Sequence, residues 1–398
     1  MGMIERFANL VVRAGVNVQP GQLVVIDTEI AHAEVARAVV DAAYRAGAGY
    51  VEMAWTDEPV RRSALEHASI ETLSASRRWA LTQIEEWHEA GIARIVLIGD
   101  PYPHLFDGVD PAKLAARRAE ESLARRNSSF NGIRWTGAAV PDPGSAREGF
   151  GEPDTERLWQ AVATAMRLDS DDPVREWQER SATLAARAKE LDALDLDEIS
   201  YQGDGTDLTV GLVAGTRWTG GGLTDEHGIV YMPNLPTEEV FTSPDRRRAE
   251  GTIRLTKPVV IGGQLVEGLR ATFRDGRITE VTADANVDVV RAQLDLDDSA
   301  RHLGEVSLVD RDSRIAKAGI VFRNTLFDEN AGCHVAWGQS FPFAVEGGLA
   351  MTPEQRAELG LNNAPVHTDV VIGGDGITVT GRGPKGTVTI IKDDEWVL

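Results

Sequence analysis

A histidine and an aspartate separated by one residue stand near the C-terminus, in the run Val366-His367-Thr368-Asp369. Residues 366–372 are largely β-branched and apolar, which predicts a strand. Successive side chains of a strand point to opposite faces, so His367 and Asp369 would share one face. An imidazole and a carboxylate on a shared face can bind a divalent cation together.

Three residues on other parts of the chain could complete such a site: Glu239, Glu305 and His334. Glu305 precedes the largely apolar run 306–309, at the expected mouth of a buried strand, where a carboxylate needs a partner. Taken alone, Glu239 is typical of a solvated surface acid and His334 of a hydrogen-bonded structural histidine. The residues by themselves therefore leave a metal site and a set of ordinary structural roles both open.

The first half of the chain alternates between strand and helix patterns. Apolar runs predict strands, and apolar residues at helical spacing predict helices between them. The strands are expected at 22–27, 50–54, 94–99 and 134–140, and the helices at 33–46 and 77–89. This alternation predicts an α/β domain with a mostly parallel sheet. The first strand is followed by Asp27-Thr28-Glu29 with no glycine-rich turn, which excludes a Rossmann-type dinucleotide site.

The second half has a different character. Residues 173–194 predict a long charged helix that connects the halves, with proline at its first position. Asp275-Gly276 predicts a hairpin turn. Short strands are expected at 208–210, 251–255, 271–273, 277–281, 377–379 and 387–391, and helices at 286–292 and 353–358. We therefore expect an α/β domain over 1–194 and an α+β, β-rich domain over 195–398, which contains all five candidate metal ligands.

Composition limits the classes of partner. A net charge of −21 over 398 residues disfavours nucleic acid and anionic membranes as partners. The single cysteine, Cys333, excludes an internal disulfide and fits a reducing compartment. Residues 1–16 predict an amphipathic helix, unlike a signal peptide, and we find no apolar stretch of membrane-spanning length. We therefore expect a cytoplasmic protein.

Four motifs, read together in their order along the chain, resemble the aminopeptidase T and aminopeptidase S family of bimetallic exopeptidases. They are NLPTEEVFTSPD, LGEVSLVD, FDENAGCHVAWG and HTDVVIGG. The resemblance extends over nearly the whole chain and includes the separations between the motifs. It implies a metalloaminopeptidase that removes N-terminal amino acids from short peptides or amino-acid amides, and that forms a homodimer.

The resemblance also assigns roles to residues. It implies that two divalent cations (zinc, cobalt or manganese) are bound by Glu239, Glu305, His334, His367 and Asp369. One cation would lower the pKa of a bound water, and the other would polarise the scissile carbonyl. We expect Glu305 to be the bridging, catalytic carboxylate, because a strand mouth would face both cations. Glu238 is a candidate proton shuttle, although neighbouring side chains on an extended segment point in opposite directions.

One position departs from the family pattern. A tyrosine that is thought to assist catalysis is replaced here by Phe341, which keeps the ring and lacks the hydroxyl. Either a neighbouring hydroxyl, from Ser340 or Tyr231, substitutes for it, or the protein acts weakly or on a specialised substrate. Two other functions remain open: a mononuclear iron dioxygenase with two histidines and one carboxylate, and a non-catalytic protein stabilised by metal.

Overall fold

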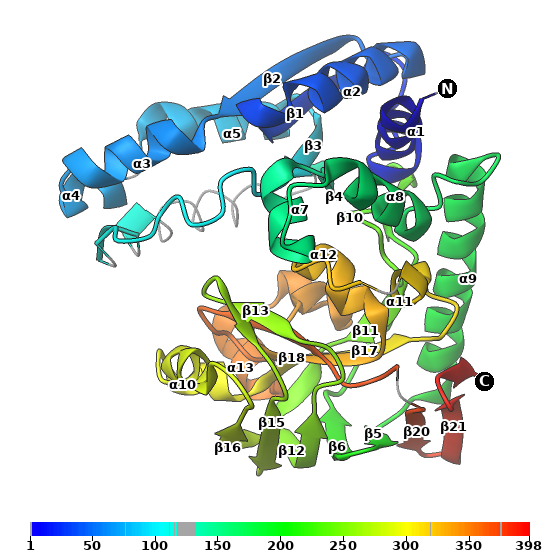
Figure 1. The fold of residues 1–398 in the computed structure, drawn as a ribbon. Helices are drawn as coiled ribbons and strands as arrows, with labels where there is room; N and C mark the ends of the chain where they lie inside the picture. The colour runs from blue at the N-terminus through cyan, green and yellow to red at the C-terminus, as the bar shows by residue number, and fades with distance from the viewer. Residues whose placement is uncertain are drawn as a thin grey trace. The chain divides into compact units, whose positions relative to one another are not determined.

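The described residues of the computed structural model form two compact units (Figure 1). The first comprises Met1–Gln178 and Gly222–Leu235, and the second comprises Glu179–Gly221 and Pro236–Leu398. The structure describes residues 2–75, 77–110, 112–114, 116–117, 133–318, 320–374 and 376–398. Within these ranges, no helix combines the length and the apolar character that crossing a membrane requires.

A parallel five-stranded sheet lies at the centre of the first unit, in the order β10–β4–β3–β1–β2. The four strands and the parallel arrangement expected from the sequence are confirmed. The fifth strand, β10, belongs to Gly222–Leu235, the segment from the middle of the chain that returns to this unit. The strands are β1 (Leu23–Glu29), β2 (Tyr50–Thr56), β3 (Ala93–Ile98), β4 (Arg134–Ala139) and β10 (Asn234–Leu235).

Helices connect these strands. Helix α2 has the bounds expected from its pattern: Val35, Val39 and Ala43 are buried, and the helix ends at Gly47 with φ of 103°. The N-terminal segment is helical as expected, although α1 continues as a π-helical turn over Val11–Gly15. The helices of this unit include α1 (Met3–Leu10), α2 (Ala33–Ala46), α3 (Glu58–His67), α4 (Ile70–Ser74), α5 (Arg78–Glu89), α7 (Pro143–Phe150) and α8 (Thr155–Ala165).

The second unit contains two main antiparallel sheets, one of five strands and one of eight. The smaller has the order β19–β18–β17–β11–β7, and the larger has the order β16–β15–β12–β6–β5–β20–β21–β22. The smaller sheet consists of β7 (Thr219–Gly220), β11 (Glu239–Thr242), β17 (Leu303–Val309), β18 (His334–Gly338) and β19 (His367–Val371). The larger consists of β5 (Glu198–Gly203), β6 (Thr206–Leu212), β12 (Pro244–Arg254), β15 (Arg270–Arg274), β16 (Arg277–Thr282), β20 (Thr378–Gly383), β21 (Gly386–Lys392) and β22 (Glu395–Trp396).

Two two-stranded ribbons and several helices complete the description. The ribbons are β8 (Leu223–Thr224) with β9 (Val230–Tyr231), and β13 (Val259–Ile261) with β14 (Gln264–Val266). The hairpin between β15 and β16 is confirmed, since Asp275 and Gly276 have φ of 49° and 77°. The remaining helices include α9 (Pro173–Leu194), α10 (Val287–Leu294), α11 (Arg314–Ala318), α12 (Thr325–Asp328) and α13 (Pro353–Leu359).

One apolar core joins the two sheets of the second unit. Alternate residues of the smaller sheet contribute to it, among them Val306, Val335, Trp337 and Val370, together with Ile199 and Val210 of the larger sheet. A strand that buries alternate residues on one side presents the intervening residues on the other. The opposite face of the smaller sheet is therefore the face on which polar side chains can gather.

The compact units do not follow the expected limits of 1–194 and 195–398. Helix α9 has the expected bounds, but its residues from Glu179 onward group with the second unit. The reason is packing, because Leu184, Ala188 and Leu191 of α9 belong to the core of that unit. As limits of independently folding domains, 1–194 and 195–398 stay a prediction.

Candidate metal centre

All five residues predicted as metal ligands lie on four neighbouring strands of the smaller sheet. Glu239 begins β11, Glu305 is the third residue of β17, and His334 begins β18. His367 and Asp369 are the first and third residues of β19. The pairing register and the alternation of side chains place all five on the face opposite the apolar core.

Small residues occupy the centre of this face. Ala336 of β18 lies directly opposite both Glu305 of β17 and Asp369 of β19. Gly338 lies opposite His367, and its φ of 106° is one that residues with a side chain rarely adopt. Between the acidic and imidazole side chains, the sheet therefore presents a methyl group and a hydrogen atom. This leaves space above the sheet for a ligand.

Two clusters of ligand atoms share Glu305. His334 Nε2 lies 3.1 Å from Glu239 Oε2 and 3.7 Å from Glu305 Oε1. His367 Nε2 lies 3.2 Å from Glu305 Oε2 and 3.3 Å from Asp369 Oδ1. In each cluster, one ligand atom per residue lies within 4.8 Å of the others. Because each oxygen of Glu305 faces a different cluster, this carboxylate has the geometry of a bridge between two cations.

Hydrogen bonds orient both imidazoles toward the clusters. The Nδ1–H of His367 donates to the backbone carbonyl of Gln339 at 2.8 Å, and that of His334 faces the carbonyl of Gly332 at 3.3 Å. A carbonyl oxygen can only accept, so these contacts assign the proton to Nδ1 and direct Nε2 at the carboxylates. This arrangement is typical of histidines that bind a metal through Nε2. Ser307 Oγ donates to Glu239 Oε2 at 2.6 Å and fixes that carboxylate.

The buried charges of the site depend on one another. Burial raises the pKa of Glu239, although hydrogen bonding to His334 opposes the rise. Burial lowers the pKa of His334, but hydrogen bonds to Glu239 and Glu305 outweigh it and raise this pKa well above its ordinary value. Burial raises the pKa of Asp369, but the positive charge of His367 outweighs it and lowers this pKa. Several acids so close together require positive charge, which protonated histidines or divalent cations can supply.

The sequence analysis missed Glu329, whose charge interacts with those of Asp369, Glu239 and Glu305. It begins a short 3-10 turn, Glu329–Ala331, directly after α12. Burial raises its pKa well above the ordinary value, and the negative charges of Asp369 and Glu239 raise it further. The carboxylate interacts with Asn330 Nδ2 at 3.4 Å. Its place five residues before His334, within a motif already singled out, is the one signal that could have identified it.

Glu238 has partners of another kind. Its carboxylate is fully buried and accepts a hydrogen bond from Arg180 Nε of α9 at 2.6 Å. Arg180 also donates to Asp310, which pairs with Arg187 at 2.5 Å. Arg180 therefore ties the start of β11 to the end of β17, since Glu238 precedes the one strand and Asp310 follows the other. The proton-shuttle role of Glu238 stays a prediction, while these contacts stabilise the two strands that carry Glu239 and Glu305.

Phe341 lies beside the site. Its ring centroid is 5.0 Å from that of His367, so the ring borders the second cluster. The neighbouring Ser340 is buried, and its Oγ accepts a hydrogen bond from the backbone amide of Asn362 at 3.0 Å. Tyr231 belongs to the other compact unit.

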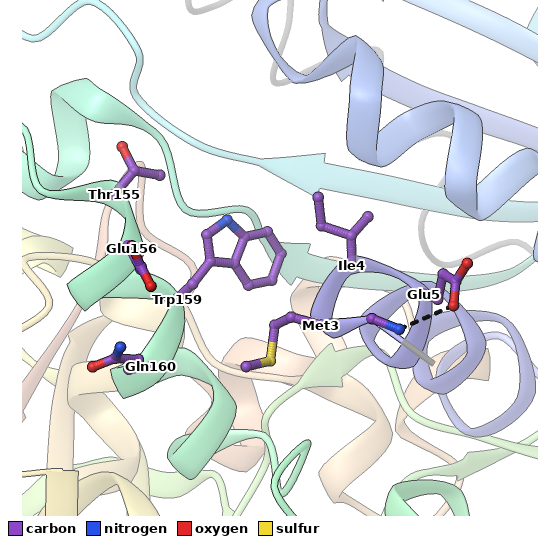
Figure 2. Close-up of a pocket in the computed structure, with 8 residues that line it drawn as sticks. Met3, Ile4, Glu5, Thr155, Glu156, Trp159 and Gln160 are labelled. Carbon is purple, nitrogen blue, oxygen red and sulfur yellow. Dashed lines mark hydrogen bonds between the residues drawn. The ribbon is translucent and has the colours of Figure 1, made fainter.

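A separate groove of about 650 Å³ lies in the first unit, between α1 and α8 (Figure 2). Met3 and Ile4 line it from one helix and Trp159 from the other, while Glu5 accepts a hydrogen bond from the backbone amide of Gly2. Its lining contains no histidine or cysteine. This groove therefore offers no imidazole or thiolate ligand for a cation.

Comparisons with known proteins identify the family of the chain. Residues 2–396 match the family described as thermophilic metalloprotease (M29). The chain is 36% identical over 392 residues to Aminopeptidase 2 of Geobacillus stearothermophilus, with 95% of each chain covered. It is 37% identical over 406 residues to Aminopeptidase T of Thermus thermophilus, covering 99% of this chain and 98% of that one.

The fold is shared as well. The solved structure of wild-type AmpT from Thermus thermophilus superposes with a TM-score of 0.90 at 34% identity, covering 100% of this chain and 99% of the other. This likeness confirms the α/β part with a parallel sheet and the β-rich part. Family and relatives together confirm a metal-dependent hydrolase of the aminopeptidase type. The chain therefore belongs to the M29 family of metalloproteases.

Proposed function

We propose that the protein removes N-terminal residues from short peptides or amino-acid amides by means of two divalent cations. Glu239, His334 and Glu305 would hold one cation, and Glu305, His367 and Asp369 would hold the other. The observation that carries this proposal is the position of Glu305, whose two carboxylate oxygens face different histidines at 3.7 Å and 3.2 Å.

The donor set fits such cations. Carboxylate oxygens and imidazole nitrogens suit zinc, cobalt or manganese. The one cysteine is excluded as a ligand, because buried Cys333 directs its Sγ at the carbonyl of Val309 at 3.4 Å. The same proposal makes Glu329 a further carboxylate near the cations. Burial raises the pKa of Glu329, and the negative charges of Asp369 and Glu239 raise it further.

Two cations at these clusters would supply an activated water and a polarised scissile carbonyl. The protein's own residues supply orientation and charge. The carbonyls of Gln339 and Gly332 fix both imidazoles, and Ser307 fixes Glu239. The surrounding carboxylates would attract the free ammonium group of a peptide and thereby confine cleavage to its first residue. Phe341 carries no proton to donate, so it would shield His367 from water without taking part in proton transfer.

Other functions have specific support and distinct consequences. Glu305 contacts both histidines, so these three residues alone are the donor types of a mononuclear iron site. Glu239 and Asp369 extend the set beyond what one iron needs, which favours two cations. Phe341 supports a weakly active or specialised hydrolase, and a metal-stabilised non-catalytic protein would keep the cations without turnover. A homodimer and a cytoplasmic location are part of the same proposal.

The test is to chelate the purified protein, add back zinc, cobalt or manganese, and measure both bound metal and the release of N-terminal residues from dipeptides and aminoacyl-anilides. We expect about two cations per chain and hydrolysis that depends on them. Glu305→Gln should abolish hydrolysis, whereas Glu280→Gln, at an exposed glutamate of β16, should not. One bound iron with oxygen consumption, or metal without hydrolysis of any substrate, would contradict the proposal.

A further inference from the structure

Three phenylalanine rings pack together beside the metal-binding face. The Phe341 ring lies 5.6 Å from that of Phe241 and 5.3 Å from that of Phe343, and the Phe241 and Phe343 rings are 6.1 Å apart. All three side chains are partly exposed. Mutually packed aromatic rings that keep exposed surface form an apolar wall that can still accept a further apolar group.

The strand register attaches this wall to the site. Phe241 follows Glu239 by two residues on β11, so both side chains lie on the same face. Phe241 also pairs with Ser307, the residue that donates to Glu239 and lies opposite His334. The wall therefore begins at the residues that fix the first ligand cluster.

The other end of the wall reaches the second cluster. Phe341 and Phe343 belong to the segment that follows β18, where Pro342–Ala344 forms a 3-10 turn. The Phe341 amide donates to Ser243 Oγ at 2.8 Å, which anchors this segment. The ring of Phe341 lies against His367, at 5.0 Å between centroids. One continuous apolar surface thus borders both clusters.

We infer that Phe241, Phe341 and Phe343 form the pocket for the side chain of the substrate's first residue and select large apolar side chains there. The inference rests on the proposed function. The first side chain branches from the carbon between the free amine and the scissile carbonyl, so it must lie within a few bonds of the ligand clusters. Of the described surfaces beside those clusters, this wall offers aromatic carbon in place of charge.

Phenylalanine at position 341, in place of the tyrosine expected from the family resemblance, keeps this wall apolar. A phenol in the wall would need a hydrogen-bonding partner whenever an apolar side chain covered it. Phenylalanine has no such requirement, so the wall is apolar across its full width. A charged first side chain, such as that of aspartate or lysine, would lose its hydration against these rings without gaining a partner.

The test compares two metal-chelating ligands that differ only in the side chain, leucine hydroxamate and alanine hydroxamate. Their dissociation constants are measured by calorimetry on the zinc-loaded protein. We expect leucine hydroxamate to bind at least about tenfold more tightly, the scale of a few methylene groups in an apolar pocket. Phe343→Ala should reduce this preference to about two- to threefold, while Phe343→Leu should keep most of it.

Phe150→Ala is the matched control, because Phe150 is a partly exposed phenylalanine at the end of α7 in the other unit. It should leave the preference unchanged. Equal binding of the two hydroxamates by the natural protein, or an unchanged preference in Phe343→Ala, would overturn the inference. Binding is read without turnover, so a protein that holds zinc and prefers leucine hydroxamate would support the wall even if peptide hydrolysis failed.

Discussion

Ala336 lies directly opposite Glu305 in the antiparallel pair of β17 and β18. Asp369 of β19 faces Ala336 from the other side, so the smallest chiral residue separates two acids on the same face. A larger side chain there would occupy the space above the sheet that the two ligand clusters surround. The space of the candidate metal centre therefore depends on Ala336, which offers no ligand atom.

Ala336→Val tests this dependence. The added methyl groups would extend between Glu305 and Asp369, so we expect the affinity for zinc to fall at least about tenfold. Circular dichroism should show an intact fold. Val335→Ile, which enlarges the neighbouring residue on the core-facing side, should leave zinc binding unchanged. Wild-type affinity in Ala336→Val would show that cations do not occupy this space.

Proton release on metal binding follows from the two histidines. Burial lowers the pKa of His334 and of His367, but their carboxylate neighbours outweigh burial and raise each pKa well above its ordinary value. Near neutral pH the metal-free protein should therefore carry both imidazoles protonated. Cations that bind at Nε2 must displace these protons, so the apparent affinity should weaken as pH falls.

Calorimetry in buffers of different ionisation enthalpy measures this exchange. We expect release of at least about two protons per chain near neutral pH when both cations bind, because Glu329, whose pKa is also raised, can add to the two from the imidazoles. Release of about one proton would place only one histidine in contact with a cation. Binding without any proton release would contradict the assignment of His334 and His367 as ligands.

Phe341→Tyr adds the tyrosine hydroxyl that the family resemblance leads us to expect at this position. The phenol would stand beside His367, where it can donate a hydrogen bond to charge that develops on the substrate carbonyl. We expect kcat to rise by about 10²-fold, as for the gain of one such donor, and KM to rise for substrates whose large apolar first side chain would cover the phenol. Phe150→Tyr is the control, because it adds the same hydroxyl to a partly exposed ring of the other unit. An unchanged kcat in Phe341→Tyr would show that turnover does not need this hydroxyl.

Arg180→Met tests the buried ion network. The arginine side chain is 9% exposed and pairs with Glu238, which is 0% exposed, and with Asp310. Loss of Arg180 removes a charged partner from two buried carboxylates, so we expect the free energy of unfolding to fall by about 3–5 kcal/mol. Arg382→Met breaks a solvent-exposed pair with Glu198 and should leave the free energy of unfolding almost unchanged. Equal losses in urea unfolding would contradict the role of Arg180.

Strongly patterned elements were predictable from the sequence. Helices α2 and α9 have the expected bounds, because apolar residues at helical spacing, with glycine after α2 and proline opening α9, leave few alternatives. The strand that carries His367 and Asp369 was expected for a similar local reason, because most of the other residues in and beside it are β-branched. The catalytic motifs were recognisable as a set only through the family resemblance.

Long-range interactions explain what local patterns could not predict. Adjacent acids at Glu238 and Glu239 are typical of solvated surface, yet both are buried, because Arg180 neutralises one and His334 contacts the other. Glu329 lies in a short 3-10 turn whose pattern gives no sign of the acids that it faces. In each case the partner is supplied by a segment distant in sequence.

The most direct test of the central claim is a count of bound zinc in the natural protein and in Glu305→Gln, measured on metal-free samples by calorimetric titration and elemental analysis. If Glu305 bridges two cations, the natural protein should bind about two per chain, and Glu305→Gln should lose tight binding at both sites. A natural protein that binds one cation, or a Glu305→Gln variant that retains two with unchanged affinity, would contradict the bridged two-metal centre.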